Sequence, residues 1–347
     1  MKKTITENEV LAALDKVEEP ELHDSLVKLH MIQNIKIEEG KIGFDLILTT
    51  PACPLKKEIE SSARQAVMAL GAGEVNINVR SVVPEDTRLK NRENIKIKNI
   101  VAIASGKGGV GKSTIAVNLA IALGETGAKV GLMDADIYGP NVHTMLGVNK
   151  IPPPRDGKIM PAEAFGLKMI SIGLLVDPNQ PLVWRGPMLH SAIRQFLMDV
   201  DWGELDYLIV DLPPGTGDAQ ISLSQIVTLT AGVIVTLPQK VSVDDARRAA
   251  NMFGQLDVPI LGVIENMSYL LMPDGTRNHL FGKDGGKKLA DELEIPFLGE
   301  IPIDPNIRSG GDNGEPIMGV DGDSDSARII NNIACDVASK ISLLHKK

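Results

Sequence analysis

The sequence predicts an α/β fold with a mostly parallel, doubly wound sheet, preceded by a small α+β domain of element order α-β-β-α-β. From residue 100 onward, short apolar runs alternate with helical stretches, which is typical of a parallel sheet covered by helices on both faces. The first run leads into the glycine- and lysine-rich stretch SGKGGVGKST at 105–114. Before residue 84, shorter segments alternate apolar and polar residues, as half-buried strands do. We therefore expect a small domain at 1–83, a charged linker at 84–97 and a large domain at 98–347.

The composition favours a globular protein with an aliphatic core. The chain has 347 residues, of which 43% are hydrophobic but only 3% aromatic, and its formal net charge is −9. This charge argues against broad binding to nucleic acid or acidic lipid, so neither is an expected partner. The first residues lack the apolar run of a signal peptide, and two cysteines, Cys53 and Cys335, are too few for a disulfide framework. A cytoplasmic protein is the expectation.

The small domain is expected to contain two helices and three strands. Thr6 and Glu9 have the spacing of a capping box and begin a helix over 6–17. Alternation at Ile35 and Ile37, and again over 42–48, predicts a hairpin with its turn at 38–41. A second helix from about Leu55 ends near Gly71, and the run VNINVRSVV at 75–83 supplies a third strand.

In the large domain, five apolar runs are expected to be parallel strands. Because the carboxyl ends of parallel strands meet at one edge of the sheet, the polar residues that follow these runs are candidates for a ligand site. The runs are IVAIA (100–104), KVGLMD (129–134), YLIVD (207–211), GVIVTLP (232–238) and PILGVIEN (259–266).

The stretch after the first run is expected to be a phosphate-binding loop. Gly106, Gly111, Lys112 and Ser113 satisfy G-x-x-x-x-G-K-[ST] between a strand and a helical segment, which predicts the sheet of a P-loop NTPase. The loop backbone N–H groups would surround phosphate oxygens, Lys112 would reach the β- and γ-phosphates, and the Ser113 hydroxyl would ligate Mg²⁺. The expected ATP-binding residues are Gly106, Lys107, Gly108, Gly109, Val110, Gly111, Lys112, Ser113 and Thr114.

Carboxylates at two further strand ends complete the predicted site. Asp211 follows YLIV and is the expected second magnesium-linked residue. Asp134 and Asp136 follow another strand. We expect Asp136 to orient the attacking water and Asp134 to support magnesium or the loop, with ordinary loop capping as the alternative for both. The predicted activity is Mg²⁺-dependent ATP hydrolysis, with Lys107, Lys112 and Asp136 as catalytic residues.

The form GKGGVGKST resembles the deviant Walker A motif of the MinD/ParA group of P-loop ATPases. In that group the early lysine reaches the nucleotide of a second subunit, so the resemblance implies a homodimer in which Lys107 acts in trans.

Longer segments resemble the Mrp/ApbC-type iron–sulfur cluster carriers. The small domain is similar, at EEPELHDSLVKLHMI (18–32) and LTTPACPL (48–55), to an accessory domain that also occurs alone in iron–sulfur assembly proteins. The resemblance implies an ATPase that assists assembly or transfer of iron–sulfur clusters to apoproteins, with assembly factors as partners, and implies that Asn266 contacts the adenine. In the large domain the similar segments are DADIYGPNVH (134–143), PLVWRGPMLHSAIRQFL (181–197), LIVDLPPGTGDAQISL (208–223), IENMSY (264–269) and LGEIPIDPNIRSGGDNGEP (298–316).

One segment departs from these carriers. They place a C-x-x-C pair just after the ENMSY stretch to hold a cluster between subunits, and here LLMPDGTRNHLFG (270–282) has no cysteine. The ligands of a transient [4Fe–4S] cluster are therefore unknown from the sequence. Cys53 is a candidate because it precedes a helix start, where the helix dipole favours a thiolate, and in a dimer it would need carboxylates or His279 as further ligands. A plain structural role is the alternative for Cys53, and Cys335 in the final apolar-faced helix is expected to be buried.

Two other functions are consistent with the sequence. One is a MinD/ParA-like positioning ATPase, for which the apolar stripe of the final helix would lie on a membrane, although core packing also explains this stripe. The other is a regulatory scaffold ATPase that lacks its own cluster. The stripe consists of Ile329, Ile330, Ile333, Val337, Ile341 and Leu344.

Overall fold

The computed structural model describes residues 5–20, 22–38, 41–88, 96–175, 186–215, 223 and 226–345, with backbone alone at 186 and 187. The chain divides into two compact units, one of Met1–Pro84 with Ala338–Lys347 and the other of Glu85–Val337. The expected limits of the two domains and the linker stay predictions. The expected linker begins with residues that pack on the large unit. Asp86 is buried, is paired with Arg88 and donates its backbone N–H to the Lys98 carbonyl.

The small unit has the predicted element order. Helix α1 (Glu7–Leu14) begins at the capping box of Thr6 and Glu9, whose side chains each accept a backbone N–H from the other residue. Helix α2 (Lys56–Met68) and the strands β3 (Ile32–Glu38), β4 (Lys41–Leu48) and β5 (Glu74–Ser81) follow. A short antiparallel pair, β1 (Glu18–Glu19) with β2 (Asp24–Ser25), was not indicated by the sequence.

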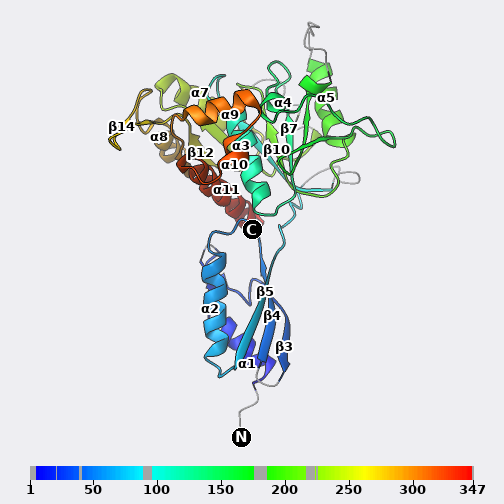
Figure 1. Cartoon of the computed structure of the whole chain (residues 1–347), viewed down its shortest axis with the longest axis vertical. Helices are drawn as coiled ribbons and strands as arrows, with labels where there is room; N and C mark the ends of the chain where they lie inside the picture. The colour runs from blue at the N-terminus through cyan, green and yellow to red at the C-terminus, as the bar shows by residue number, and fades with distance from the viewer. Residues whose placement is uncertain are drawn as a thin grey trace. The chain divides into compact units, whose positions relative to one another are not determined.

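The three strands form one sheet in the order β3-β4-β5, with β3 antiparallel and β5 parallel to β4. Both helices pack on the same face of this sheet (Figure 1). Alternate residues of β4 such as Ile42 and Leu46 share one buried cluster with Leu14 of α1 and Ile59 of α2. The opposite face is polar. Asp45 accepts hydrogen bonds there from the side chains of Asn34 and Asn78, each at 2.7 Å.

The large unit is built on an eight-stranded sheet of order β15-β12-β11-β6-β10-β7-β9-β8. All neighbouring pairs are parallel except β8 with β9. The mostly parallel sheet is thus confirmed, and it includes β9 and β15, which the sequence did not indicate. The strands are β6 (Ile97–Ala104), β7 (Val130–Asp134), β8 (Ala162–Ala164), β9 (Leu167–Ser171), β10 (Leu205–Asp211), β11 (Ala231–Thr236), β12 (Ile260–Glu265) and β15 (Phe297–Glu300).

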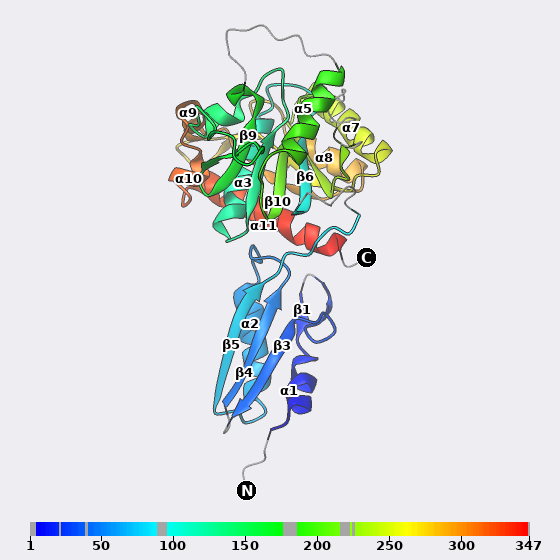
Figure 2. The ribbon, with the colours of Figure 1, turned by 90° about the vertical axis from the view of Figure 1, so that its right-hand side faces the viewer.

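Helices cover both faces of this sheet, as a doubly wound fold requires (Figure 2). Helices α5, α7 and α8 share one hydrophobic cluster with alternate strand residues such as Ile100 and Ala102, whereas α3 packs on the other face. The helices are α3 (Lys112–Glu125), α4 (Val142–Met145), α5 (Gly186–Met198), α7 (Lys240–Gln255), α8 (Gly285–Glu292), α9 (Pro305–Asn313), α10 (Ile317–Val320) and α11 (Asp325–Leu344), of which the part from Ala338 onward belongs to the other unit.

The apolar stripe of α11 is a core surface in this structure. Ile330, Ile333, Val337 and Ile341 are buried, which favours core packing over membrane contact as the reason for the stripe. Cys335, expected to be buried, is half-buried. Among the residues that the structure describes, no helix is both long and apolar enough to cross a membrane.

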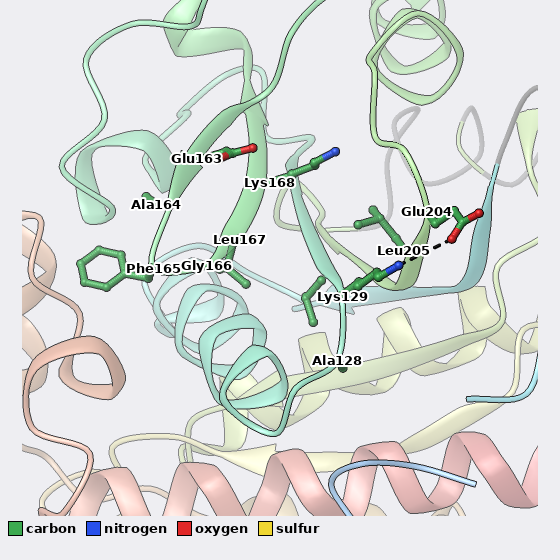
Figure 3. A pocket seen from close by; sticks show the side chains of 11 residues that line it. Ala128, Lys129, Glu163, Ala164, Phe165, Gly166, Leu167, Lys168, Glu204 and Leu205 are labelled. Carbon is green, nitrogen blue, oxygen red and sulfur yellow. Dashed lines mark ion pairs between the residues drawn. The ribbon is translucent and has the colours of Figure 1, made fainter. Parts of the chain in front are cut away.

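A cavity of about 640 Å³ lies where β7, β9 and β10 begin (Figure 3). Its lining includes Phe165, at the turn of the β8–β9 hairpin, and the exposed ion pair of Lys129 with Glu204, whose side-chain atoms are 3.5 Å apart. Because the predicted ligand residues follow the ends of the strands, this cavity is at the opposite edge of the sheet from them.

Candidate functional site

The predicted phosphate-binding loop joins the end of β6 to the start of α3. Gly109 and Gly111 have φ angles of 81° and 82°, in the left-handed region that favours glycine. A Cβ atom at Gly109 would meet nothing within 4 Å, so this side of the loop is open. The loop can therefore present its backbone to a ligand without obstruction by side chains.

Gly106 has a different reason to be glycine. A Cβ atom at this position would overlap the backbone of Asp245 and Ala246 in α7. The motif predicted a glycine here, but only the structure shows that its near neighbour is a helix that lies more than 130 residues further along the chain.

A buried ion pair lies where the loop joins α3. Lys112 Nζ is 2.5 Å from Asp211 Oδ1 and 3.3 Å from Ser113 Oγ. The exposed fraction is 6% for Lys112 and 0% for Asp211. Strands β6 and β10 are adjacent, which explains why the predicted Lys112 and Asp211 meet.

Asp211 also retains an unused acceptor. Its Oδ2 atom is buried and has no hydrogen-bond partner among the described residues. A buried polar atom without a partner is costly, and a carboxylate beside a hydroxyl is the oxygen donor set that Mg²⁺ prefers. The residues present therefore fit the predicted magnesium site.

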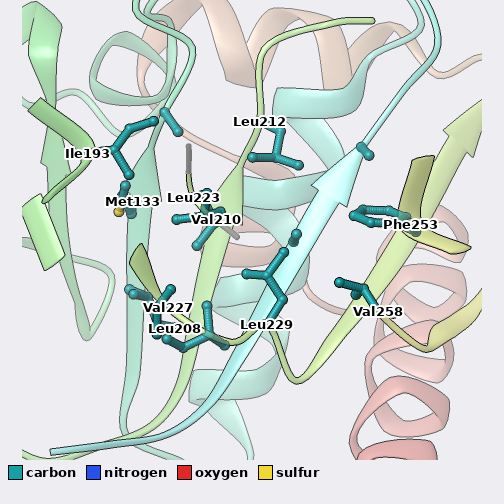
Figure 4. Close-up of a cluster of buried hydrophobic side chains, with 14 of the residues drawn as sticks. Met133, Ile193, Leu208, Val210, Leu212, Leu223, Val227, Leu229, Phe253 and Val258 are labelled. Carbon is teal, nitrogen blue, oxygen red and sulfur yellow. The ribbon is translucent and has the colours of Figure 1, made fainter. Parts of the chain in front are cut away.

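The core fixes the strand ends that carry these carboxylates. Figure 4 shows Val210 and Leu212, on either side of Asp211 in sequence, packed with Met133 and Leu223 in the buried cluster. Tight apolar packing restricts the backbone on both sides of the functional side chain.

Asp134 lies beside Asp211 because the two residues are register partners at the ends of β7 and β10. Burial raises the pKa of Asp134 to about 7, and the nearby Asp211 carboxylate acts in the same direction. Asp136 is half-buried, and burial raises its pKa too. The structure thus brings the predicted Asp134, Asp136, Asp211 and Lys112 into one group.

Lys107 is half-buried in the loop, and its backbone carbonyl accepts a hydrogen bond of 3.0 Å from Ser105 Oγ. Within the described part of the chain, no carboxylate lies within ion-pair distance of its ammonium group. The Ser105 carbonyl accepts from the Gly215 N–H at 2.9 Å, so the loop after Asp211 is tied to the phosphate-binding loop.

Asn266 follows β12 and lies against the phosphate-binding loop. Its Nδ2 donates to the Val110 carbonyl at 2.8 Å, and a Cβ atom at Gly111 would overlap this amide. In this conformation the amide donor is engaged by the protein, and the adenine contact stays a prediction.

The candidate cluster ligands do not form a metal site among the described residues. There, no group of three or more His, Cys, Asp or Glu side chains could hold a metal ion. Residues 270–282 contain the hairpin of β13 (Leu270–Leu271) with β14 (Arg277–Asn278), and His279 Nδ1 lies 3.1 Å from the Ser268 carbonyl. Cys53 is half-buried in the small unit.

Ser171, at the end of β9, was missed by the sequence reasoning. It is fully buried, and its hydroxyl donates to Asp134 Oδ2 at 2.8 Å. The signal that could have found it is the one that found Asp134, a polar residue directly after a short apolar run.

Comparisons with known proteins agree with this geometry. Residues 96–338 match the ParA family, described as NUBPL iron-transfer P-loop NTPase, and residues 7–79 match a family described as iron–sulfur cluster assembly protein. An iron–sulfur cluster carrier protein from Synechocystis sp. is 49% identical over 98% of this chain and 99% of its own length. Another from Deinococcus radiodurans is 47% identical over 96% of this chain and 95% of its own length.

Solved structures support the same fold. A nucleotide-binding protein from Archaeoglobus fulgidus in complex with ADP is 38% identical, with a TM-score of 0.56 over 63% of this chain and 88% of that chain. The cell division ATPase MinD from Pyrococcus furiosus, 24% identical, has a TM-score of 0.52 over 69% of this chain and 98% of that chain, and supports the fold alone. From the match over residues 96–338 and the full-length relatives, this chain belongs to the family of NUBPL iron-transfer P-loop NTPases.

Proposed function

We propose that this protein is a Mg²⁺-dependent ATPase that carries iron–sulfur clusters and transfers them to apoproteins. One observation supports ATP binding and hydrolysis above all. Lys112 and Asp211 form a buried ion pair beside the open glycine-rich loop, and Asp211 Oδ2 has no hydrogen-bond partner among the described residues. The proposed transfer of iron–sulfur clusters is supported by the similarity of nearly the whole chain to proteins named iron–sulfur cluster carriers.

In the proposed site, Lys112 leaves Asp211 and binds the phosphate oxygens when ATP enters the loop. Asp211 and the Ser113 hydroxyl would hold Mg²⁺, and a bound Mg²⁺ would supply positive charge beside the phosphates. Asp136 orients the attacking water from the end of β7, while Asn266 contacts the adenine. The open side of the loop at Gly109 supports this arrangement because it leaves room for phosphates.

The active form is proposed to be a homodimer in which Lys107 of each subunit reaches the nucleotide of the other. A half-buried lysine with no ion pair in the described part of its own chain supports this role. Its charge would be free to stabilise the negative charge that accumulates on the transferred phosphoryl group.

The iron–sulfur cluster is the cargo, and any cysteine ligands have to come from outside residues 270–282, which contain none. We propose that Cys53 contributes a thiolate in the dimer and that carboxylates or His279 are the further ligands. A transient [4Fe–4S] cluster with few thiolate ligands from the carrier would be released readily to a client with four cysteines.

The test is anaerobic reconstitution of the full chain with iron and sulfide, followed by iron and labile-sulfide counts and visible absorbance. Cys53→Ala is compared with wild type, and Cys335→Ala is the matched control because it removes the other cysteine. We expect a cluster in wild type and Cys335→Ala and its loss in Cys53→Ala. A wild-type protein that hydrolyses ATP but never acquires a cluster, even with an acceptor apoprotein present, would point to the scaffold function that the missing C-x-x-C pair favours.

A further inference from the structure

A row of buried polar side chains crosses three neighbouring strand ends beside the nucleotide site. Asp211 of β10 is the register partner of Asp134 of β7, and Asp134 is the register partner of Ser171 of β9. Asp134 and Ser171 have no exposed surface. The mechanism above uses Asp211 and leaves Ser171 without a role.

The Asp134 carboxylate is held by hydrogen bonds from three segments. Its Oδ2 accepts from the Ser171 hydroxyl at 2.8 Å and from the Val142 N–H at the start of α4 at 3.3 Å. Its Oδ1 accepts from the Asp136 N–H at 3.1 Å. The carboxylate therefore fixes the loop between β7 and α4 at both of its ends.

The Ser171 hydroxyl has a defined direction. Its oxygen accepts the Gly173 N–H at 3.2 Å, which caps the 3₁₀ turn Ile172–Leu174, and its single hydrogen is donated to Asp134. His143 Nδ1 lies 3.4 Å from the same oxygen, and a Cβ atom at Gly173 would overlap the His143 ring. Burial lowers the pKa of His143, which favours the neutral imidazole in this packed position.

Through these contacts Ser171 is connected, by way of Asp134, to Asp136, the residue proposed to orient the attacking water. Ser171 fixes the Asp134 carboxylate, which holds the backbone of Asp136. Gly139 N–H, in the same loop, donates to Asp136 Oδ1 at 3.3 Å, so the side chain also depends on the shape of this loop. A small rotation of the Asp134 carboxylate would therefore move Asp136.

We propose that Ser171 is a positioning residue for ATP hydrolysis, whose hydroxyl orients Asp134 and thereby places Asp136. This inference rests on the proposed ATPase function. It adds the end of β9 to a site so far built from the ends of β6, β7 and β10.

The test measures steady-state ATP hydrolysis by full-length wild type, Ser171→Ala and Ser171→Thr. We expect Ser171→Ala to lower kcat about 10-fold, the factor for the loss of one hydrogen bond, with KM for ATP within about twofold of wild type. Ser171→Thr keeps the hydroxyl and should restore most of kcat. Ser342→Ala is the control, since it removes another buried hydroxyl, one that donates to the Ala338 carbonyl, and should leave kcat unchanged.

Hydrogen–deuterium exchange tests the same idea without relying on activity. Ser171→Ala should speed exchange at the amides of Asp136 and Val142, while the amides of α7 keep their wild-type rates. Unchanged kcat and unchanged exchange in a folded Ser171→Ala protein would overturn the proposal, as would a change in KM alone. A wild-type protein without ATPase activity would instead overturn the proposed function, and the exchange data would still decide whether Ser171 holds the loop.

Discussion

At the scale of single residues, the most informative feature is the ion pair of Lys112 with Asp211. Both groups are almost completely buried, so each depends on the other for compensation of its charge. The same pair is proposed to separate when ATP binds. Its stability in the nucleotide-free protein and its catalytic role can therefore be tested together.

Replacing Lys112 by methionine should destabilise the nucleotide-free protein by about 3–5 kcal/mol, because it leaves the Asp211 carboxylate buried without a partner. The double variant Lys112→Met with Asp211→Asn should regain much of this loss. Both proteins should fail to hydrolyse ATP. Urea unfolding followed by circular dichroism measures the stabilities, and equal stability of Lys112→Met and wild type would contradict the buried pair.

The role of Lys107 in trans gives a complementation test. Lys107→Ala should bind ATP normally but hydrolyse it on the order of 10³-fold more slowly, as loss of a charge on the transferred phosphoryl group predicts. Asp136→Ala should also be inactive, and should remain an ATP-bound dimer. Mixing the two variants should restore activity, because the Lys107→Ala subunit keeps its own Asp136 and receives Lys107 from the other subunit. If the mixture stays inactive although mixed dimers form, Lys107 does not act across the interface.

At the scale of elements, the phosphate-binding loop is held between helices that come from distant parts of the sequence. Helix α7 lies against Gly106. Within α3, the buried Asn118 donates to the Thr114 carbonyl at 2.8 Å and accepts the Met318 N–H of α10 at 3.1 Å. The loop and the helix that follows it are thus supported from two sides, which keeps the site in place before nucleotide binds.

Gly106→Ala should displace α7 or the loop, since the new methyl group would overlap helix backbone and not a flexible side chain. We expect loss of ATP binding, measured by calorimetric titration, and a lower unfolding midpoint. Gly254→Ala is the matched control in the same helix α7, where an added Cβ atom meets nothing within 4 Å. It should be neutral or stabilising by up to about 1 kcal/mol through helix propensity. Normal ATP binding by Gly106→Ala would show that α7 can move without cost.

At the scale of the whole molecule, the two units depend on different polar groups. The large unit contains the buried carboxylates of the nucleotide site. The small unit contains Asp45, whose pKa is held below its ordinary value of 3.8 by hydrogen bonds from Asn34 and Asn78, with a smaller contribution from Arg80. A carboxyl group with a lowered folded-state pKa stabilises the fold above its unfolded pKa, and this contribution is lost as the pH falls.

The free energy of unfolding of the small unit should therefore decrease below about pH 4. After correction for the intrinsic pH dependence of exchange, amides of β4 should exchange faster at pH 3 than at pH 5 in wild type. Asp45→Asn should remove most of this difference, because it has no carboxylate to protonate. Glu58→Gln, on an exposed position of α2, is the control and should keep the wild-type response. A response in Asp45→Asn equal to that of wild type would show that other carboxyl groups control the acid behaviour.

Local patterns in the sequence were enough to predict many of the helices and strands. The capping box of Thr6 and Glu9, the alternation in β4 and the strand–loop–helix around Lys112 all formed as predicted, because each depends on residues close together in the chain. The strands β9 and β15 were not predicted, because Lys168 interrupts the apolar run of β9 and only Phe297 and Leu298 are apolar side chains in β15. Ser171 was missed together with the strand that places it.

What the sequence by itself determined was the kind of site, because the glycine loop, its lysine and the carboxylates after apolar runs are each contiguous signals. What only the tertiary structure decided was which of these signals are neighbours. The row of Asp211, Asp134 and Ser171 exists because β10, β7 and β9 are adjacent in the sheet, and Gly106 is needed because α7 lies against it. Strand order and helix placement depend on the free energy of packing between residues far apart in the chain. No local pattern of residues encodes this packing free energy.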